Sequence, residues 1–213
     1  MNAVLAPERR DRLRQAKLAQ RSTLSAPEVQ RWSAQIQARA LALTCFSTVQ
    51  AVALYSPIHN EVDTDSLLNH ALARGKRVFL PRWMGQEFAF AQVARRGELA
   101  VGRFGILEPS GALGLTDADK QSLLVFVPGV VFDGRGNRSG RGGGSYDRLL
   151  EQCRGSATAV GLAYEFQIVD AVPAQSWDFA MHFIVTEMRT IDCQIAQRQT
   201  GAVVDGELRR GVL

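Results

Sequence analysis

The sequence has few cysteines and no long hydrophobic run, and both shortages limit where the protein can work. Its three cysteines, Cys45, Cys153 and Cys193, match no metal-binding spacing, and an odd number cannot pair completely. We therefore expect reduced thiols and a cytoplasmic location. The longest apolar run, residues 123–132, is interrupted by a Pro-Gly pair and has about half of the ~20 residues that a membrane span needs. We predict no membrane partner.

Neither sign of charge is in large excess. The 25 lysines and arginines against 21 acidic residues give a net charge of +4. This mild excess favours anionic ligands, but it does not choose between a small molecule and a nucleic acid. Hydrophobic residues at 46% and charged residues at 22% are usual for a globular protein and exclude a disordered or fibrous one. The length of 213 residues allows one sizeable core.

Helical and strand patterns alternate along the chain. Ser25, followed by Pro27 and Glu28, is a helix-start pattern and predicts one helix on each side of it within residues 7–43. The alternation predicts an α/β fold, a three-layer sandwich with a mostly parallel central sheet and helices on both faces. The other expected helices span residues 63–74 and 145–153, and the expected strands span residues 49–55, 76–80 (closed by Pro81), 87–94 at the sheet edge, 123–127, 157–162 and 183–186. We predict one domain over residues 1–188 and a loosely held tail of unknown role over residues 189–213.

A turn rich in glycine and arginine, residues 134–148, follows the most apolar strand. Glycine allows positive φ angles and close approach of the backbone to a ligand, and free N–H groups next to a helix start attract anions. Ligands of open α/β sheets bind at the carboxyl ends of strands, where this turn must lie. The sequence therefore predicts a phosphate site. The alternatives are a flexible surface loop and an arginine-glycine nucleic-acid segment, but such segments are usually long, repetitive and terminal.

Asp147 lies in the first turn of the helix expected after the glycines. A carboxylate there can complement the helix dipole. It can equally hold magnesium against bound phosphates, because Mg²⁺ prefers carboxylate oxygens together with substrate phosphate. Spacing alone leaves the two roles open.

Residues 124–150 carry a longer pattern: a hydrophobic strand, Pro-Gly, an aspartate, and then G-x-R-x-G-x-G-x-G-x-Y-D-R. This pattern resembles the hallmark of the 5-formyltetrahydrofolate cyclo-ligase family. Further segments match in the family's order: Arg10 and Arg14, YSPIHNEVDT from Tyr55, GKRVFLPR from Gly75, GRFGILEP from Gly102 and VPAQSWDFAMHFIVTE from Val172. The resemblance covers about residues 8–188.

The resemblance implies a catalytic domain that converts 5-formyltetrahydrofolate and ATP into 5,10-methenyltetrahydrofolate, ADP and phosphate, with magnesium. An amide oxygen is a poor leaving group, so phosphorylation of the formyl oxygen must precede ring closure. Phosphoryl transfer of this kind depends on positioning and charge neutralisation. The partners implied are a reduced folate and ATP, with no nucleic acid, and we expect a monomer.

The resemblance also implies roles for individual residues. The predicted catalytic residues are Glu61, Arg141 and Tyr146. The predicted ATP-binding residues are Arg10, Arg14, Arg138, Ser139, Gly140, Arg141, Gly142, Gly143, Gly144, Ser145 and Tyr146. The predicted substrate-binding residues are Tyr55, Ser56, Glu61, Gly142, Gly143, Gly144 and Ser145. Asp147 and Asp178 match the positions expected to bind magnesium.

Three positions depart from the family pattern. Ser145 stands where a tyrosine is common, Arg10 replaces a common lysine, and His182 stands where an aspartate is frequent. His182 is either a metal ligand or a structural histidine. Two other functions stay open: a non-catalytic folate- or nucleotide-binding protein of the same fold, and an RNA-binding protein, which the scarcity of aromatic residues near the turn disfavours.

Overall fold

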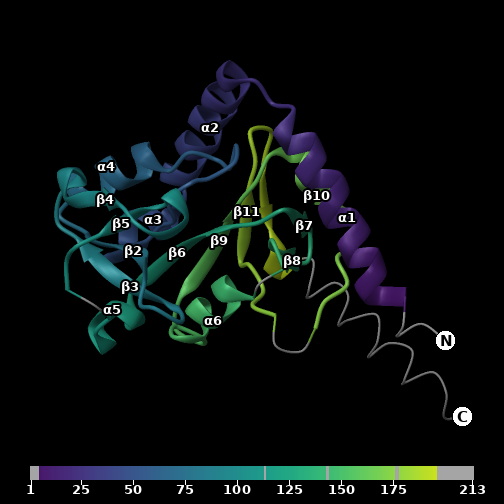
Figure 1. The fold of residues 1–213 in the computed structure, drawn as a ribbon. Helices are drawn as coiled ribbons and strands as arrows, with labels where there is room; N and C mark the ends of the chain where they lie inside the picture. The colour runs from purple at the N-terminus through teal and green to yellow at the C-terminus, as the bar shows by residue number, and fades with distance from the viewer. Residues whose placement is uncertain (1–4, 113, 143, 176–177, 196–213) are drawn as a thin grey trace, which may run out of the picture.

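The computed structural model describes residues 5–112, 114–142, 144–175 and 178–195. Its centre is a seven-stranded sheet in the order β12-β11-β9-β6-β1-β2-β3 (Figure 1). The five inner strands are parallel, and β3 and β12 add to the edges antiparallel. The strands are β1 Ala51–Ala53, β2 Arg77–Trp83, β3 Phe88–Val93, β6 Leu123–Pro128, β9 Thr158–Leu162, β11 Phe183–Val185 and β12 Thr190–Asp192.

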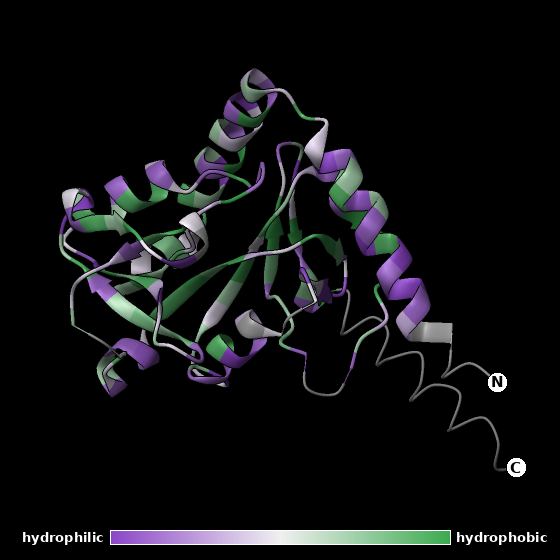
Figure 2. Ribbon diagram, in the orientation of Figure 1, coloured by the Kyte–Doolittle hydropathy of each residue, from purple (hydrophilic) through white to green (hydrophobic). Residues whose placement is uncertain are grey.

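Helices cover both faces of this sheet, which confirms the predicted three layers. In β1, Val52 packs into the core shared with α2, α3 and α4, whereas Ala51 and Ala53 pack into the core shared with α6. Figure 2 shows the central strands as largely hydrophobic and α1 as mixed. The helices are α1 Leu5–Ser22, α2 Ala26–Leu41, α3 Thr44–Thr48, α4 Asp65–Ala73, α5 Asp117–Gln121 and α6 Ser145–Glu151. In the part of the chain that the structure describes, no helix is long and apolar enough to cross a membrane.

The glycine-rich segment is not one continuous loop. Its first part forms a hairpin of β7 (Val131–Asp133) and β8 (Arg138–Ser139), and β10 (Ile168–Val169) pairs with β7. The buried Asp133 carboxylate causes the turn, because it accepts hydrogen bonds from the backbone N–H groups of Arg135 (3.0 Å) and Asn137 (3.1 Å). The predicted single turn is therefore divided, and the part from Arg138 onward reaches the functional site.

Two predicted boundaries were wrong. β2 does not close at Pro81 but continues to Trp83. Its neighbour β1 pairs with β2 only as far as Phe79, so beyond that residue β2 pairs on one side alone, where a proline without an N–H is tolerated. The segment 190–192, predicted as part of a loose tail, forms β12 and pairs with β11. Residues 196–213 of the predicted tail lie outside the described residues.

The strand order changes direction between β1 and β6. From β1 the chain passes to β2 on one side, and β6 then adds on the other side of β1 and leads outward to β9 and β11. The segments that leave the carboxyl ends of β1 and β6 therefore diverge. Open α/β sheets bind ligands at such a switch point. A two-stranded hairpin, β4 (Leu99–Val101) with β5 (Leu107–Pro109), lies near this end of β1, because Ser56 donates a hydrogen bond to the carbonyl of Leu107 (2.5 Å).

Candidate functional site

A cavity of about 500 Å³ opens at the switch point. Tyr55 and Ser56 follow β1, Pro128 ends β6, and α1 adds one side of the cavity. The cavity is of the size that small ligands occupy. The predicted site residues that line it are Arg10, Arg14, Tyr55, Ser56, Glu61, Arg138, Ser139, Gly140, Arg141, Gly142, Gly144, Tyr146, Asp147 and Asp178.

Two glycines of the turn have conformations that favour glycine. Gly142 has φ +105, and a Cβ atom there would lie 3.1 Å from the Arg14 Nη1 atom. Gly144 has φ +63 and precedes α6. A side chain at either position would strain the backbone. Glycine here lets the turn fold back toward α1 and enter the cavity.

Arg10 ties α1 to two other cavity segments. Its Nη1 lies 3.0 Å from an oxygen of Asp178, and its Nη2 donates to the carbonyl of Arg138 (2.9 Å). Its Nε donates to the Ser139 hydroxyl at a longer 3.4 Å. A guanidinium provides these diverging donors in one plane, which a lysine in the same place would not.

Arg138 and Asp147 form a second ion pair on the cavity surface. Arg138 is buried, its Nη2 donates to Asp147 Oδ1, and its Nη1 donates to the carbonyl of Pro128 (3.2 Å). The Nε of Arg138 is buried without a hydrogen-bond partner. The guanidinium also lies 5.8 Å from the ring centroid of Tyr146. A third pair joins Arg14 Nη1 to Asp11 at 3.0 Å. Each of these arginines thus faces a carboxylate beside the cavity.

Glu61 lies in a separate, more enclosed part of the site. Its Oε2 accepts a hydrogen bond from the backbone N–H of Ile58 (3.1 Å), and its Oε1 lies 3.5 Å from Arg21 Nη2 and 3.8 Å from Arg141 Nε. Burial raises the pKa of Glu61, although Arg21 opposes this shift most strongly. The two arginines therefore stabilise the ionised carboxylate, whereas its burial makes ionisation less favourable.

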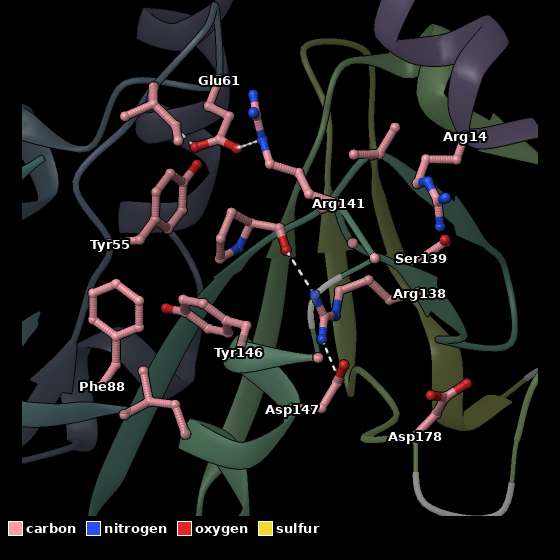
Figure 3. Close-up of a pocket in the computed structure, with 18 of the residues that line it drawn as sticks. Arg14, Tyr55, Glu61, Phe88, Arg138, Ser139, Arg141, Tyr146, Asp147 and Asp178 are labelled. Atoms are coloured by element: carbon pink, nitrogen blue, oxygen red, sulfur yellow. Dashed lines mark hydrogen bonds and ion pairs between the residues drawn. The ribbon is translucent and has the colours of Figure 1, made fainter. Parts of the chain in front are cut away.

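Aromatic side chains lie on the same side of the cavity as Glu61. Figure 3 shows Tyr55 and Phe88 on that side, Tyr146 beside them, and Arg14, Arg138 and Asp178 opposite. The Tyr55 hydroxyl donates to the carbonyl of Val62 (2.8 Å), and burial raises the pKa of Tyr55 well above its usual value. Burial also raises the pKa of Tyr146. Both tyrosines are therefore neutral, and they offer the cavity ring surface and not an ionised oxygen.

Three predicted positions do not contribute a described side chain to the cavity. Gly143 lies outside the described residues, and Ser145 begins α6 with a side chain that is not among those described. His182 is not among the residues that line the cavity. Its Nδ1 accepts a hydrogen bond from the backbone N–H of Ala159 (3.0 Å), and burial lowers its pKa. This geometry favours the structural interpretation of His182.

Sequence reasoning missed Arg21 and Phe88. Arg21 is only 2% exposed and contacts Glu61, so it belongs to the site although it does not line the cavity. Its spacing was a usable signal, because it lies two turns after Arg14 on the same face of α1. Phe88 lines the cavity from the edge strand β3, and nothing in its local pattern distinguishes it from other edge residues.

Magnesium would need carboxylate ligands at the cavity. Among the described residues no group of three or more His, Cys, Asp or Glu side chains forms a ready metal site. Asp147 and Asp178 nevertheless both line the cavity, each next to an arginine. Mg²⁺ is commonly held by one or two carboxylates completed by phosphate and water. The two aspartates fit such a site better than a site made of protein ligands alone.

The fold and the cavity together define an α/β protein with a ligand-sized cavity, one side of which is rich in arginine and the other in aromatic residues. Comparison with known proteins shows the family within this class. The profile of the 5-formyltetrahydrofolate cyclo-ligase family matches residues 6–187. The 5-formyltetrahydrofolate cyclo-ligase of Escherichia coli (strain K12) is 33% identical over 177 residues, which are 79% of this chain and 96% of that protein. The Mus musculus protein of the same name is 28% identical over 188 residues, 81% of this chain and 91% of that protein.

Two solved structures also align with most of this chain. The 5,10-methenyltetrahydrofolate synthetase of Aquifex aeolicus aligns with a TM-score of 0.76 and 35% identity over 86% of this chain and 92% of that chain. The synthetase of Mycoplasma pneumoniae aligns with a TM-score of 0.67 and 25% identity over 84% of this chain and 98% of that chain. The chain belongs to the 5-formyltetrahydrofolate cyclo-ligase family, a family of ligases.

Proposed function

We propose that the protein closes the ring of 5-formyltetrahydrofolate to give 5,10-methenyltetrahydrofolate, with ATP converted to ADP and phosphate in the presence of Mg²⁺. The observation that carries this proposal is the division of one cavity into an arginine-rich side and an aromatic side that contains Glu61. A phosphate donor and a flat heterocycle could then meet within a single site.

The arginine-rich side supports binding of the ATP phosphates. Arg10, Arg14 and Arg138 converge there with the turn that contains Gly142. Because each of these arginines already contacts a carboxylate, arriving phosphates would take the place of Asp178 at Arg10 and of Asp147 at Arg138. Arginine makes charge-assisted hydrogen bonds to phosphate as it does to carboxylate, often two at once, so each guanidinium can exchange one partner for the other.

The same exchange would free two carboxylates for the metal. Asp147 and Asp178 would hold Mg²⁺ next to the phosphates, and the ion would neutralise charge that develops during transfer. Protein residues would then position the phosphate chain through Arg10 and Arg138. In this arrangement metal and nucleotide bind together and not independently.

The aromatic side supports binding of the folate. Phe88 and Tyr146 present ring surface for the pterin, and Glu61 can accept hydrogen bonds from ring N–H groups or face the formyl end. Arg141, which lies 3.8 Å from Glu61, reaches from the turn toward the boundary between the two sides. It is placed to neutralise a phosphoryl group as it passes from ATP to the formyl oxygen.

The chemistry follows from the balance of bonds. The formyl oxygen attacks the terminal phosphorus, a new P–O bond forms, and the bond to ADP breaks. Nitrogen 10 then attacks the activated carbon, the carbon–oxygen bond breaks, and phosphate leaves as the nitrogen gives up its proton. The arginines would stabilise the charge that develops in both steps.

The direct test is incubation of the purified protein with 5-formyltetrahydrofolate, ATP and Mg²⁺ while the absorbance of the methenyl product is followed. Product formation that requires all three reagents supports the proposal. Folded protein that binds the folate without releasing ADP would favour instead a non-catalytic binding protein, for which the substituted position Ser145 is the motivating observation. We further propose that the protein is cytoplasmic and acts as a monomer. Light scattering, which measures molar mass in solution, tests the oligomeric state.

A further inference from the structure

Arg21 is a buried arginine at the end of α1 that the proposed reaction does not use. Its Nη1 donates to the carbonyl of Gly129 (3.1 Å), and its Nη2 lies 3.5 Å from Glu61 Oε1. The side chain is 2% exposed, and that of Glu61 is 10% exposed. A buried guanidinium is costly unless a carboxylate and hydrogen-bond acceptors compensate it. The position of Arg21 therefore depends on Glu61, and that of Glu61 on Arg21.

A second contact also joins the end of α1 to the loop before Glu61, and here the loop residue is the hydrogen-bond donor. The side-chain amide of Asn60 donates to the carbonyls of Arg21 (3.2 Å) and Leu24 (3.1 Å). The Arg21 carbonyl lies in the last turn of α1, where helical partners run out, and Leu24 follows the helix two residues after its end. His59 and Asn60 have φ angles of +50 and +59, a conformation that asparagine tolerates better than most residues. The loop before Glu61 is thus docked on α1 by its side chains and its backbone shape.

We infer that Arg21 and Asn60 are positioning residues that hold the Glu61 carboxylate ionised and directed into the folate side of the cavity. Neither residue lines the cavity, so neither would touch the substrate. The identity of the ligand of Glu61 rests on the proposed function, whereas the control of Glu61 by Arg21 does not. Because α1 also carries Arg10, one helix joins the nucleotide side of the cavity to its folate side.

The charged and titratable groups around Glu61 explain why Arg21 matters most. Arg21 faces it from α1, Arg141 from the turn, Tyr55 from the end of β1, and Tyr146 from α6. The tyrosines are neutral, so the carboxylate is stabilised by Arg21, by the backbone N–H of Ile58 and by Arg141, in that order. Burial raises the pKa of Glu61, and Arg21 contributes more than Arg141 to lowering it. Without Arg21 the pKa rises further, and less of the carboxylate is ionised near neutral pH.

The test compares Arg21→Gln with Arg12→Gln, which removes the same charge from a 79% exposed side chain of the same helix. Arg21→Gln should raise the KM for 5-formyltetrahydrofolate about tenfold near pH 7 and change the KM for ATP less than about twofold. The folate penalty should shrink as the pH is raised above about 7, because the carboxylate ionises again. Arg12→Gln should match the wild type. A purely structural role of Arg21 would give a penalty that does not vary with pH, whereas the uncharged Asn60 acts on the loop alone and its loss has no such pH dependence.

Carboxyl NMR of ¹³C-labelled glutamate tests the inference without turnover. The Glu61 signal should titrate at higher pH in Arg21→Gln than in the wild type, and in Arg21→Lys it should stay near the wild-type position. A wild-type titration in Arg21→Gln overturns the inference, even if the protein turns over folate normally. Asn60→Gly keeps the positive φ but loses both hydrogen bonds, so it should raise the folate KM at all pH values. An unchanged KM in Asn60→Gly overturns the positioning role of Asn60. If Arg21→Gln does not fold, Arg21→Met, which fills the buried space without the charge, gives the same two measurements for Arg21.

Discussion

Arg138 and Asp147 form an ion pair between a buried guanidinium and a carboxylate that faces the cavity. Arg138 comes from the short strand β8, and Asp147 lies in the first turn of α6. The glycines between them let the chain reverse so that the two side chains meet. This pair balances a buried positive charge on the arginine-rich side of the cavity.

Asp147→Ala should abolish measurable turnover while the protein stays folded. The variant loses a proposed metal ligand and leaves the Arg138 charge without its carboxylate, so we also expect a loss of about 1–3 kcal/mol in the free energy of unfolding. Turnover assays and thermal unfolding measure the two effects. Asp117→Ala, at a 96% exposed aspartate of α5, is the control. Turnover equal to wild type would show that the metal assignment is wrong.

Binding of magnesium and nucleotide should be strongly linked. Asp147 and Asp178 each form an ion pair with an arginine, so Mg²⁺ alone would have to compete with a guanidinium for each carboxylate. Calorimetry should detect little Mg²⁺ binding without nucleotide and at least about tenfold tighter binding with a non-hydrolysable ATP analogue. Equal Mg²⁺ affinity in both cases would contradict the exchange of partners proposed for these aspartates.

Glu61→Gln should raise the folate KM by about tenfold or more and affect the ATP KM much less. The carboxylate accepts hydrogen bonds more strongly than an amide, and only the folate is expected to reach it. Because burial raises the pKa of Glu61, wild-type folate affinity should fall on acidification at a pH above the usual glutamate value of 4.5. A larger effect on ATP would mean that the two subsites are exchanged.

Phe88→Leu should weaken folate binding about fivefold and leave ATP binding unchanged, since an aliphatic side chain fills part of the space but offers no ring to stack on. Fluorescence titration with 5-formyltetrahydrofolate measures the effect. Folate affinity that is unaffected in Phe88→Leu would show that Phe88 is not part of the folate site.

Local sequence signals predicted the sheet and the turn well because each has a local physical cause. The capping box at Ser25 separates α1 from α2, and the apolar run in residues 123–127 becomes the central strand β6. The glycines at 142 and 144 bring the turn into the cavity, as their conformational freedom predicts. Such features depend on neighbouring residues and can be read along the chain.

Contacts between distant segments could not be predicted in the same way. Arg21 is a charged residue of a polar helix, and its burial depends on Glu61, which lies in a loop far along the chain. The pairing of Asp178 with Arg10 is likewise visible only in three dimensions. The strand β12 has little periodicity of its own and forms because β11 offers an edge. Side-chain partners of this kind follow from the fold and not from local patterns.

The central claim is that ATP phosphorylates the formyl oxygen in a cavity that holds both reactants. The most direct measurement uses 5-formyltetrahydrofolate labelled with ¹⁸O in its formyl group, with mass spectrometry of the phosphate released by the wild-type protein. We expect one labelled oxygen in each phosphate and one ADP for each methenyl product formed. Product accompanied by unlabelled phosphate, or folded protein that forms no product, would contradict the claim.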